Sequence, residues 1–203
     1  MSGILVKGLS FPRGRKHPRR SEEDTGFAMR RQVRVLSSKT LYDGRVIRVT
    51  LDRVVEPGGV EASREVVEHH GSVVIIPRLP NGRIVLVRQY RHPARKYLWE
   101  LVAGSMEPGE GVLRAARREL KEETGYRAGS LKRLFSYYPS PGFLTEQMHL
   151  VEARDLTLST AAPESDERIE VGEFSKAQID KLLRDKKIAD GKTLVGLLWD
   201  RHK

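Results

Sequence analysis

The chain has no cysteine among its 203 residues, which excludes disulfide bonds, thiolate metal ligands and thiol catalysis. No apolar run approaches the roughly 20 residues that a membrane-spanning helix needs. The apolar stretch at residues 3–6 is too short for the apolar segment of a secretory signal peptide. We therefore expect a cytoplasmic protein with no membrane partner.

Hydrophobic residues make up 38% of the chain and charged residues 32%, which is typical of a globular protein. The formal net charge is +10. A basic balance fits a polyanionic partner such as nucleic acid, a membrane surface or a phosphorylated metabolite, but it also serves solubility. Charge alone leaves these interpretations open.

Residues 1–30 form a predicted tail. A basic run at residues 13–20 is followed by Ser21-Glu22-Glu23-Asp24, and no apolar periodicity is present. Such segments usually stay solvated. A nucleic-acid-binding arm is one interpretation, and a flexible extension without a nucleic-acid partner is the one that we favour.

Beyond the tail, alternating apolar residues and turn signals predict many strands. Expected strands lie at residues 33–35, 46–51, 64–68, 72–76, 83–87, 97–101, 131–138, 146–153 and 168–174. Helices are expected from Val112 to a glycine cap at Gly125, from an N-cap at Ser175 to Leu183, and over residues 192–199. This mixture favours an α+β fold, arranged as an α/β/α sandwich.

The helix that starts at Val112 carries Glu119, Glu122 and Glu123 within a sector of about 100°. Neighbouring carboxylates repel one another, and burial would raise their pKa values. Basic neighbours relieve this repulsion, and so do hard cations such as Mg²⁺, which prefer carboxylate oxygens. The glutamates alone are therefore compatible with a salt-bridged surface or with a metal site.

The spacing around these glutamates is more specific. Gly104 is followed by five residues, Glu110, seven residues, Arg118-Glu119-Leu120, one residue, Glu122-Glu123, one residue and Gly125. This pattern resembles the signature of Nudix hydrolases, in which Glu110 stands at the position of a supporting acid and Tyr126 replaces an aliphatic residue. The resemblance implies a Nudix fold with a mixed β-sheet. It also implies a loop–helix–loop that binds Mg²⁺, or alternatively Mn²⁺, and hydrolyses a nucleoside diphosphate linked to another group.

The same resemblance assigns catalytic roles by position. Glu119 and Glu123 resemble the main metal ligands, and Glu122 resembles an additional or water-mediated ligand. The carbonyl of Ala103 resembles the backbone ligand. Arg118 resembles the residue that orients the glutamates by ion pairing.

Other segments are similar to the ADP-ribose pyrophosphatase subfamily, namely residues 41–44, 64–69, 99–104 and 138–143. The likeness implies hydrolysis of ADP-ribose to AMP and ribose 5-phosphate. GDP-mannose or another nucleotide sugar is the alternative substrate, because enzymes that cleave GDP-mannose share much of this pattern. A third and less favoured hypothesis is an RNA-binding or RNA-processing Nudix protein.

The resemblance further implies a homodimer in which the N-terminal strands cross to the other subunit. Residues 31–70 are then an antiparallel β-region for dimerisation and base contacts, and residues 71–203 are the Nudix hydrolase domain. The implied substrate contacts are Arg45, Val46, Arg64, Glu65, Arg91, Ser140 and Glu146.

Within that set, Arg45 and Val46 match a segment that flanks the base. Arg64 and Arg91 would pair with phosphates, since a guanidinium fork suits phosphate oxygens, or would form surface salt bridges instead. Glu65 would accept hydrogen bonds from ribose hydroxyls or an adenine amine. Ser140 and Glu146 match a loop that contacts the terminal ribose.

One further acid is expected in the polar segment at residues 163–171. Glu167 aligns with the family's loop glutamate, which binds metal or acts as the general base. Some relatives have a second glutamate where this chain has Ser165. The assignment of the base therefore stays divided between Glu167 and Glu164.

Overall fold

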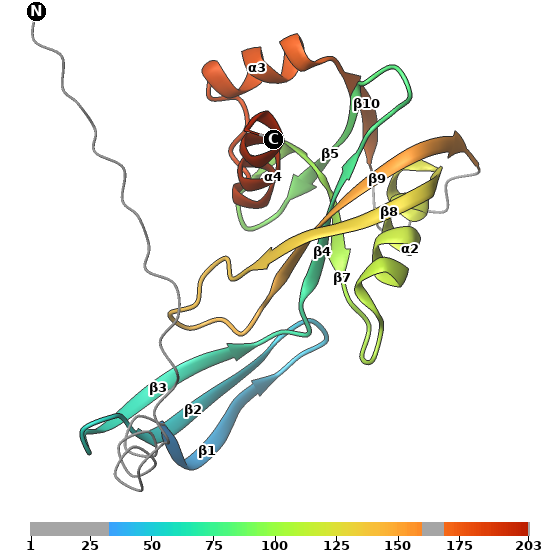
Figure 1. The fold of residues 1–203 in the computed structure, drawn as a ribbon. Coiled ribbons are helices and arrows are strands. Elements are labelled where there is room, and N and C mark those ends of the chain that lie inside the picture. The colour runs from blue at the N-terminus through green and yellow to red at the C-terminus, as the bar shows by residue number, and fades with distance from the viewer. Residues whose placement is uncertain (1–32, 160–168, 203) are drawn as a thin grey trace, which may run out of the picture.

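The computed structural model describes residues 33–159 and 169–202 (Figure 1). The predicted tail at residues 1–30 lies outside this part of the chain. So do Glu164, Ser165 and Glu167, on which the predicted loop acid depends. In the part described, no helix is both long and apolar enough to cross a membrane.

The first three strands form a sheet of their own. Strands β1 (Arg34–Asp43), β2 (Arg48–Val55) and β3 (Glu61–Glu68) pair antiparallel in the order β1-β2-β3. Gly58 and Gly59 close the β2–β3 turn at φ values of 98° and 86°, where other residues would be strained. This sheet projects from the rest of the molecule (Figure 1), and every residue of β1 is exposed.

Two further sheets build the body. One has the order β7-β4-β9-β8, and the other has the order β10-β5-β6. Their bounds are β4 Ser72–Pro77, β5 Ile84–Arg91, β6 Lys96–Glu100, β7 Val102–Ser105, β8 Tyr126–Tyr137, β9 Met148–Leu158 and β10 Glu170–Phe174. Strand β4 pairs parallel with β9, whereas β7 and β8 run antiparallel to their neighbours, so this sheet is mixed.

Strand β4 is buried on both faces, and its side chains alternate between two cores. Val73 and Ile75 pack in the core under helix α2 (Val112–Thr124). Val74 and Ile76 pack in the core under helices α3 (Lys176–Arg184) and α4 (Gly191–Arg201). Helices therefore cover both faces of the sheet, which confirms the predicted α+β sandwich.

Local signals explain where the helices end. Gly125 adopts a left-handed conformation with φ of 74° and caps α2. Ser175 and Gln178 form a reciprocal capping box at the start of α3. Asp190 caps α4 by accepting a hydrogen bond from the amide of Thr193. The first two boundaries agree with the sequence prediction.

Some predicted boundaries were wrong. Strand β8 begins at Tyr126 rather than residue 131, because the amide of Ser159 bonds to the Gly125 carbonyl and pairing with β9 starts directly after the helix cap. Strand β9 correspondingly runs to Leu158. A separate strand β7 follows β6 after Leu101, and helix α4 extends beyond both predicted ends.

Candidate functional site

Two glutamates of α2, Glu119 and Glu122, converge on Arg118. Its guanidinium lies 2.7 Å from the Glu119 carboxylate and 3.1 Å from Glu122. It also reaches back to Glu110 at 3.0 Å, and it donates to the Ser105 carbonyl on β7 at 3.0 Å. The hydrogen bond from Arg118 is the main reason why the pKa of Glu110 is lowered. One guanidinium therefore holds three carboxylates of the predicted signature together.

Helix α2 presses this cluster against strand β7. Glu119 and Glu123 are both buried, while Glu122 is half-buried. A Cβ atom added at Gly104 would lie only 2.0 Å from Cδ of Glu119. Glycine at this position is thus needed for the Glu119 carboxylate to lie against the backbone next to Ala103.

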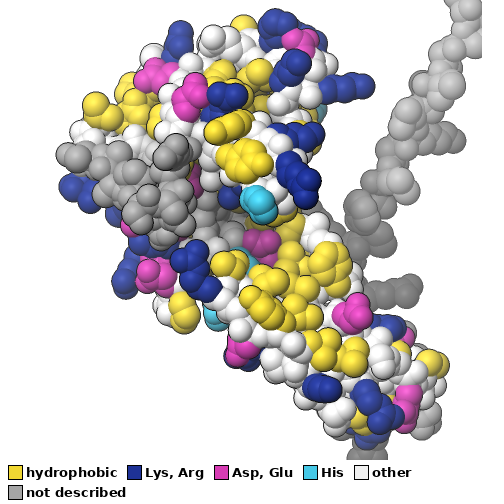
Figure 2. Space-filling view, turned by 180° about the vertical axis from the view of Figure 1, so that it is seen from behind, with side chains coloured by type: hydrophobic (Ala, Val, Ile, Leu, Met, Phe, Trp, Pro, Cys, Tyr) yellow, Lys and Arg dark blue, Asp and Glu magenta, His cyan; other side chains and the backbone are white. Residues whose placement is uncertain are grey.

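These residues line a cleft with a volume of about 550 Å³. The α2 side contributes Arg118 and the three glutamates, and Gln89 and Arg91 come from β5. Arg45 and Val46 come from the β1–β2 turn. In Figure 2, acidic and histidine side chains gather near the junction of the projecting arm with the body.

Arg91 is held in the cleft by a buried ion-pair network. Glu100 is fully buried and accepts two hydrogen bonds from Arg91, at 2.9 and 2.8 Å. This contact raises the pKa of Arg91. Lys192, at the start of α4, pairs with Glu100 and also with Asp190 at 3.0 Å. The network fixes an arginine whose side chain is 39% exposed, so part of this side chain is accessible from the cleft.

A second polar group lies where β3 leads into β4. The Nδ1 atom of His69 accepts a hydrogen bond from the Gly71 amide at 3.0 Å and lies 3.7 Å from Glu146. Glu146 in turn accepts a hydrogen bond from the Ser72 hydroxyl. On its other side, Nε2 of His69 lies 3.4 Å from the Ser105 hydroxyl. Because Nδ1 accepts from Gly71, neutral His69 carries its proton on Nε2.

The structure brings only some of the predicted substrate residues together. Arg45, Val46 and Arg91 line the cleft with the glutamates, and Glu146 lines an adjoining cavity. Arg64 and Glu65 lie on β3 and do not line the cleft; Arg64 pairs with Glu56. The substrate-binding roles of these six residues stay predictions.

Ser140 also lies outside the cleft lining. Its carbonyl accepts hydrogen bonds from the amides of Phe143 and Leu144, so it shapes the turn after β8. Its predicted contact with the terminal ribose stays a prediction.

The donor set suits a hard cation, although it is arranged around arginine. Among the residues described, no three His, Cys, Asp or Glu side chains are grouped so as to hold a metal ion. The reason is visible for Glu119 and Glu122, which both turn an oxygen toward Arg118. Carboxylate oxygens beside a backbone carbonyl are nevertheless the ligand types that Mg²⁺ prefers, and the close approach at Gly104 brings Glu119 to the backbone next to Ala103.

Sequence reasoning missed several residues of the site. His69 and Lys192 line the adjoining cavity, and His70 and Gln89 line the cleft. Lys192 lies 92 positions from its partner Glu100, so no local pattern could reveal the pair. The two adjacent histidines after a strand were the only local signal for this part of the site.

Comparison with known proteins covers nearly the whole described chain. The family model described as NUDIX domain matches residues 68–194. The model described as nucleoside diphosphate sugar hydrolase N-terminal domain matches residues 33–67. The boundary between the two matches falls at the end of β3, where the projecting sheet meets the body.

Several curated proteins are similar over most of their length. ADP-ribose pyrophosphatase of Bacillus subtilis (strain 168) is 34% identical, covering 83% of this chain and 92% of that protein. GDP-mannose pyrophosphatase of Yersinia enterocolitica is 32% identical, covering 75% and 85%. The crystal structure of an ADP compounds hydrolase matches with a TM-score of 0.74 and 26% identity, covering 84% of this chain and 93% of that one.

Proposed function

The chain belongs to the NUDIX domain family, and on that premise we propose that it hydrolyses the diphosphate linkage of nucleoside diphosphate sugars, with ADP-ribose as its main substrate. The products would be AMP and ribose 5-phosphate. The observation that carries the proposal is the cleft in which Arg91 faces the glutamates of α2. A diphosphate needs cationic partners, and its hydrolysis needs carboxylates nearby.

The predicted metal ligands lie on α2 and β7. Glu119, Glu122, Glu123 and the Ala103 carbonyl would hold Mg²⁺, or alternatively Mn²⁺. The chemistry that a divalent ion supplies in such a site is neutralisation of the diphosphate charge and a lower pKa for a neighbouring water. Arg118 orients the carboxylates through its ion pairs.

Substrate binding and proton transfer fall to other groups. Arg91 donates to Glu100 through Nε and Nη2, and it would bind the phosphate oxygens through its remaining N–H donors. Arg45 and Val46 would lie beside the base. Glu167 and Glu164 stay the two candidates for the general base that accepts the proton of the attacking water.

We further propose that the protein is a cytoplasmic homodimer that joins through the projecting sheet. GDP-mannose is the second candidate substrate, because this chain is also 32% identical to a GDP-mannose pyrophosphatase. The two substrates share the diphosphate and differ at the base and the sugar, so the glutamate cluster cannot distinguish them.

Hydrolysis of ADP-ribose, GDP-mannose and ADP-glucose, each with Mg²⁺ and with EDTA, tests the proposal. We expect ADP-ribose to have the highest kcat/KM and EDTA to abolish turnover. Glu123→Gln should lower kcat by at least about 100-fold. Loss of a residue that only hydrogen-bonds to a metal ligand already costs up to about 100-fold, and loss of the ligand itself should cost no less. Circular dichroism should show an unchanged fold.

The matched control is Glu61→Gln at the start of β3, which removes the carboxylate of an exposed pair with Arg53 of β2. This variant should keep normal turnover. Hydrolysis that survives both EDTA and Glu123→Gln would reject the metal assignment, and no turnover of any nucleotide sugar would reject the proposed function.

A further inference from the structure

The turn between β3 and β4 fixes His69 through several hydrogen bonds. The Thr145 hydroxyl accepts from the His69 amide at 2.9 Å and donates to the His69 carbonyl at 3.3 Å. The amide of Gly71 donates to Nδ1 of the ring at 3.0 Å. Both the backbone and the imidazole of His69 are therefore held in one orientation.

Gly71 also joins this turn to the end of β7. Its carbonyl accepts a hydrogen bond from the amide of Met106 at 3.0 Å. Its φ of 94° lies in the left-handed region, which favours glycine, and an added Cβ would lie 3.1 Å from the Gln147 carbonyl. The same glycine thus fixes the His69 ring and the strand end that this ring faces.

The Nε2 atom of His69 contacts the hydroxyl of Ser105 on β7. The two atoms lie 3.4 Å apart, and because Nδ1 accepts from Gly71, Nε2 is the donor in this contact. The separation is long for a hydrogen bond, as is common in enzyme sites before a ligand binds. The Ser105 oxygen therefore accepts from His69, and its own proton is left to donate elsewhere.

That proton has no acceptor among the residues that the structure describes. Ser105 is exposed, and it lines both the cleft beside the α2 glutamates and an adjoining cavity of about 250 Å³. Its carbonyl accepts from Arg118 at 3.0 Å, so its backbone is fixed as well. An oriented donor is thus presented between the two cavities, where Arg91 also belongs to both linings.

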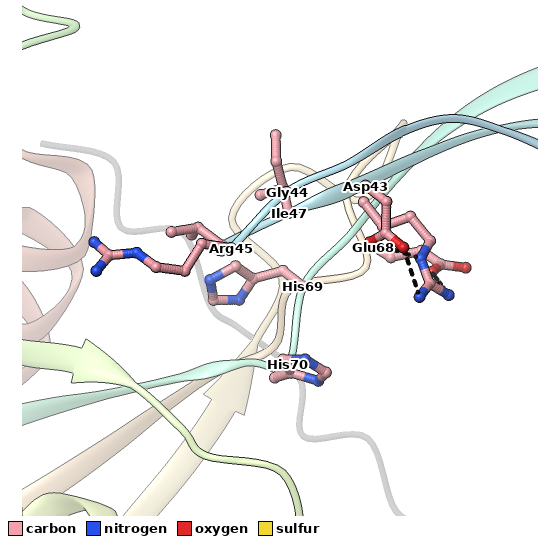
Figure 3. A pocket seen from close by; sticks show the side chains of 9 residues that line it. Asp43, Gly44, Arg45, Ile47, Glu68, His69 and His70 are labelled. Atoms are coloured by element: carbon pink, nitrogen blue, oxygen red, sulfur yellow. Dashed lines mark hydrogen bonds and ion pairs between the residues drawn. The ribbon is translucent and has the colours of Figure 1, made fainter.

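The two adjacent histidines of the turn face different ways. In Figure 3 the ring of His69 lies on the side of Arg45, while the ring of His70 points away from it. Arg45 and His69 both belong to the lining of the cleft. His69 is the histidine whose ring contacts β7.

We propose that the Ser105 hydroxyl binds a phosphate oxygen of the substrate, and that His69 is the positioning residue that turns this hydroxyl toward it. This inference rests on the proposed function and adds two residues to its diphosphate site. An ionised diphosphate only accepts hydrogen bonds, so it suits a hydroxyl whose oxygen already accepts from His69. Ser105 thereby supplies a neutral donor beside the cationic Arg91.

Steady-state hydrolysis of ADP-ribose with Mg²⁺ by the variant Ser105→Ala tests the donor. We expect KM to rise about tenfold, which is what loss of a hydrogen bond to a charged group costs at the low end. The value of kcat should stay nearly unchanged, because the bond is made in the ground state and the transition state alike. Ser105→Thr, which restores a hydroxyl, should recover most of the loss.

The proposed contact also predicts how the effect depends on the substrate. The nucleotide sugars share the diphosphate and differ at the base and the sugar. Ser105→Ala should therefore raise KM by the same factor for every nucleotide sugar that the wild type hydrolyses.

His69→Asn tests the positioning role. The asparagine carbonyl can accept from the amide of Gly71, two residues ahead, but the side chain lacks the Nε2 donor that faces Ser105. We expect a similar rise in KM, and no further rise when Ser105→Ala is added, because both changes remove the same oriented donor. Circular dichroism checks that each variant folds.

Ser130→Ala and His92→Asn are the matched controls. Ser130 is exposed on β8, and His92 is exposed between β5 and β6. Neither residue lines the cleft or the adjoining cavity. Both variants should keep the KM of the wild type.

Each failure has its own signature. An unchanged KM in Ser105→Ala, beside normal turnover by the wild type, would overturn the inference and leave the proposed function standing. Effects that multiply in the double variant would overturn the positioning role of His69, and different factors for different nucleotide sugars would overturn the phosphate contact. If the wild type cleaves no nucleotide sugar, the proposed function fails and this inference fails with it.

Discussion

The missing side chain of Gly104 gives the Glu119 carboxylate the space that it occupies. We predict that Gly104→Ala lowers kcat/KM for ADP-ribose by about 100-fold, because a catalytic group displaced by about 1 Å can cost that much. The cause is the Cβ atom, which would lie 2.0 Å from Cδ of Glu119 and force the carboxylate away from β7. Turnover of the purified variant, together with its circular dichroism spectrum, measures this effect.

Gly111 offers a control for the same substitution. No atom lies within 4 Å of a Cβ added there, and its φ of −78° is open to any residue. Gly111→Ala should keep turnover within about twofold, although it should cost a few tenths of a kcal/mol at the helix N-cap. Equal activity of the two alanine variants would show that the position of Glu119 is not critical.

His149 makes the free energy of unfolding depend on pH. It is buried on β9, and the Ser136 hydroxyl lies 2.6 Å from its Nδ1 atom. Desolvation, and then the charge of Arg133, lower its pKa. The unfolded chain therefore binds a proton near pH 6.5 that the folded chain does not bind until lower pH.

The direction of the pH effect on the free energy of unfolding follows from the lower pKa of His149 in the folded chain. The contribution of His149 to stability is complete above pH 6.5 and is lost as the pH falls from there toward the folded-state pKa. Urea denaturation between pH 5 and 8 should show this decline, and His149→Gln should flatten it. The window lies above the titration of Glu110, whose pKa is lowered from 4.5. An unchanged slope in the variant would contradict the assignment.

On the scale of secondary-structure elements, Glu100 at the end of β6 connects this strand to β5 and to α4. Glu100 binds Arg91 of β5 and Lys192 of α4, and it is fully buried. We predict that Glu100→Gln lowers the free energy of unfolding by about 3 kcal/mol, because it leaves cationic groups without their buried partner. It should also raise KM for ADP-ribose, since Arg91 loses its fixed orientation.

Chemical denaturation and steady-state kinetics measure the two effects. Glu61→Gln again serves as the control, since both partners of that pair are more than half exposed. It should change stability by less than about 1 kcal/mol, the usual limit for a surface pair. A small effect of Glu100→Gln on both stability and KM would show that the network does not position Arg91.

The same elements show how far the sequence could lead. Gly125 marks the end of α2 and Ser175 marks the start of α3. Both boundaries could be predicted because capping depends on residues close in the sequence, and both predictions were confirmed. The start of β8 was missed because its pairing with β9 is set by contacts more than twenty residues apart. Fixed spacing on one helix revealed Arg118 and its glutamates, whereas His69 and the Glu100–Lys192 pair depend on how distant strands and helices meet.

On the scale of the whole molecule, the projecting sheet is the feature that leaves an entire strand exposed. Strand β1 is exposed along its length, including the apolar residues Val35, Leu36, Leu41 and Tyr42. Figure 2 shows hydrophobic side chains gathered on the arm. A long, exposed apolar edge strand promotes association with another chain, which supports the proposed homodimer.

We predict that size-exclusion chromatography with light scattering gives a molar mass twice the 23.0 kDa of one chain. The double variant Val35→Glu, Leu41→Glu should be a monomer. The new charges would have to be buried without partners in the interface, which is costly. Because Arg45 in the cleft belongs to the turn between two strands of the same sheet, kcat/KM for ADP-ribose should fall together with dimerisation.

Leu158→Glu, at a side chain of β9 that is 77% exposed, is the control and should remain dimeric and active. A wild-type chain that stays monomeric at micromolar concentration and still turns over ADP-ribose at full rate would exclude the dimer as a requirement. A double variant that remains dimeric would place the interface elsewhere on the molecule.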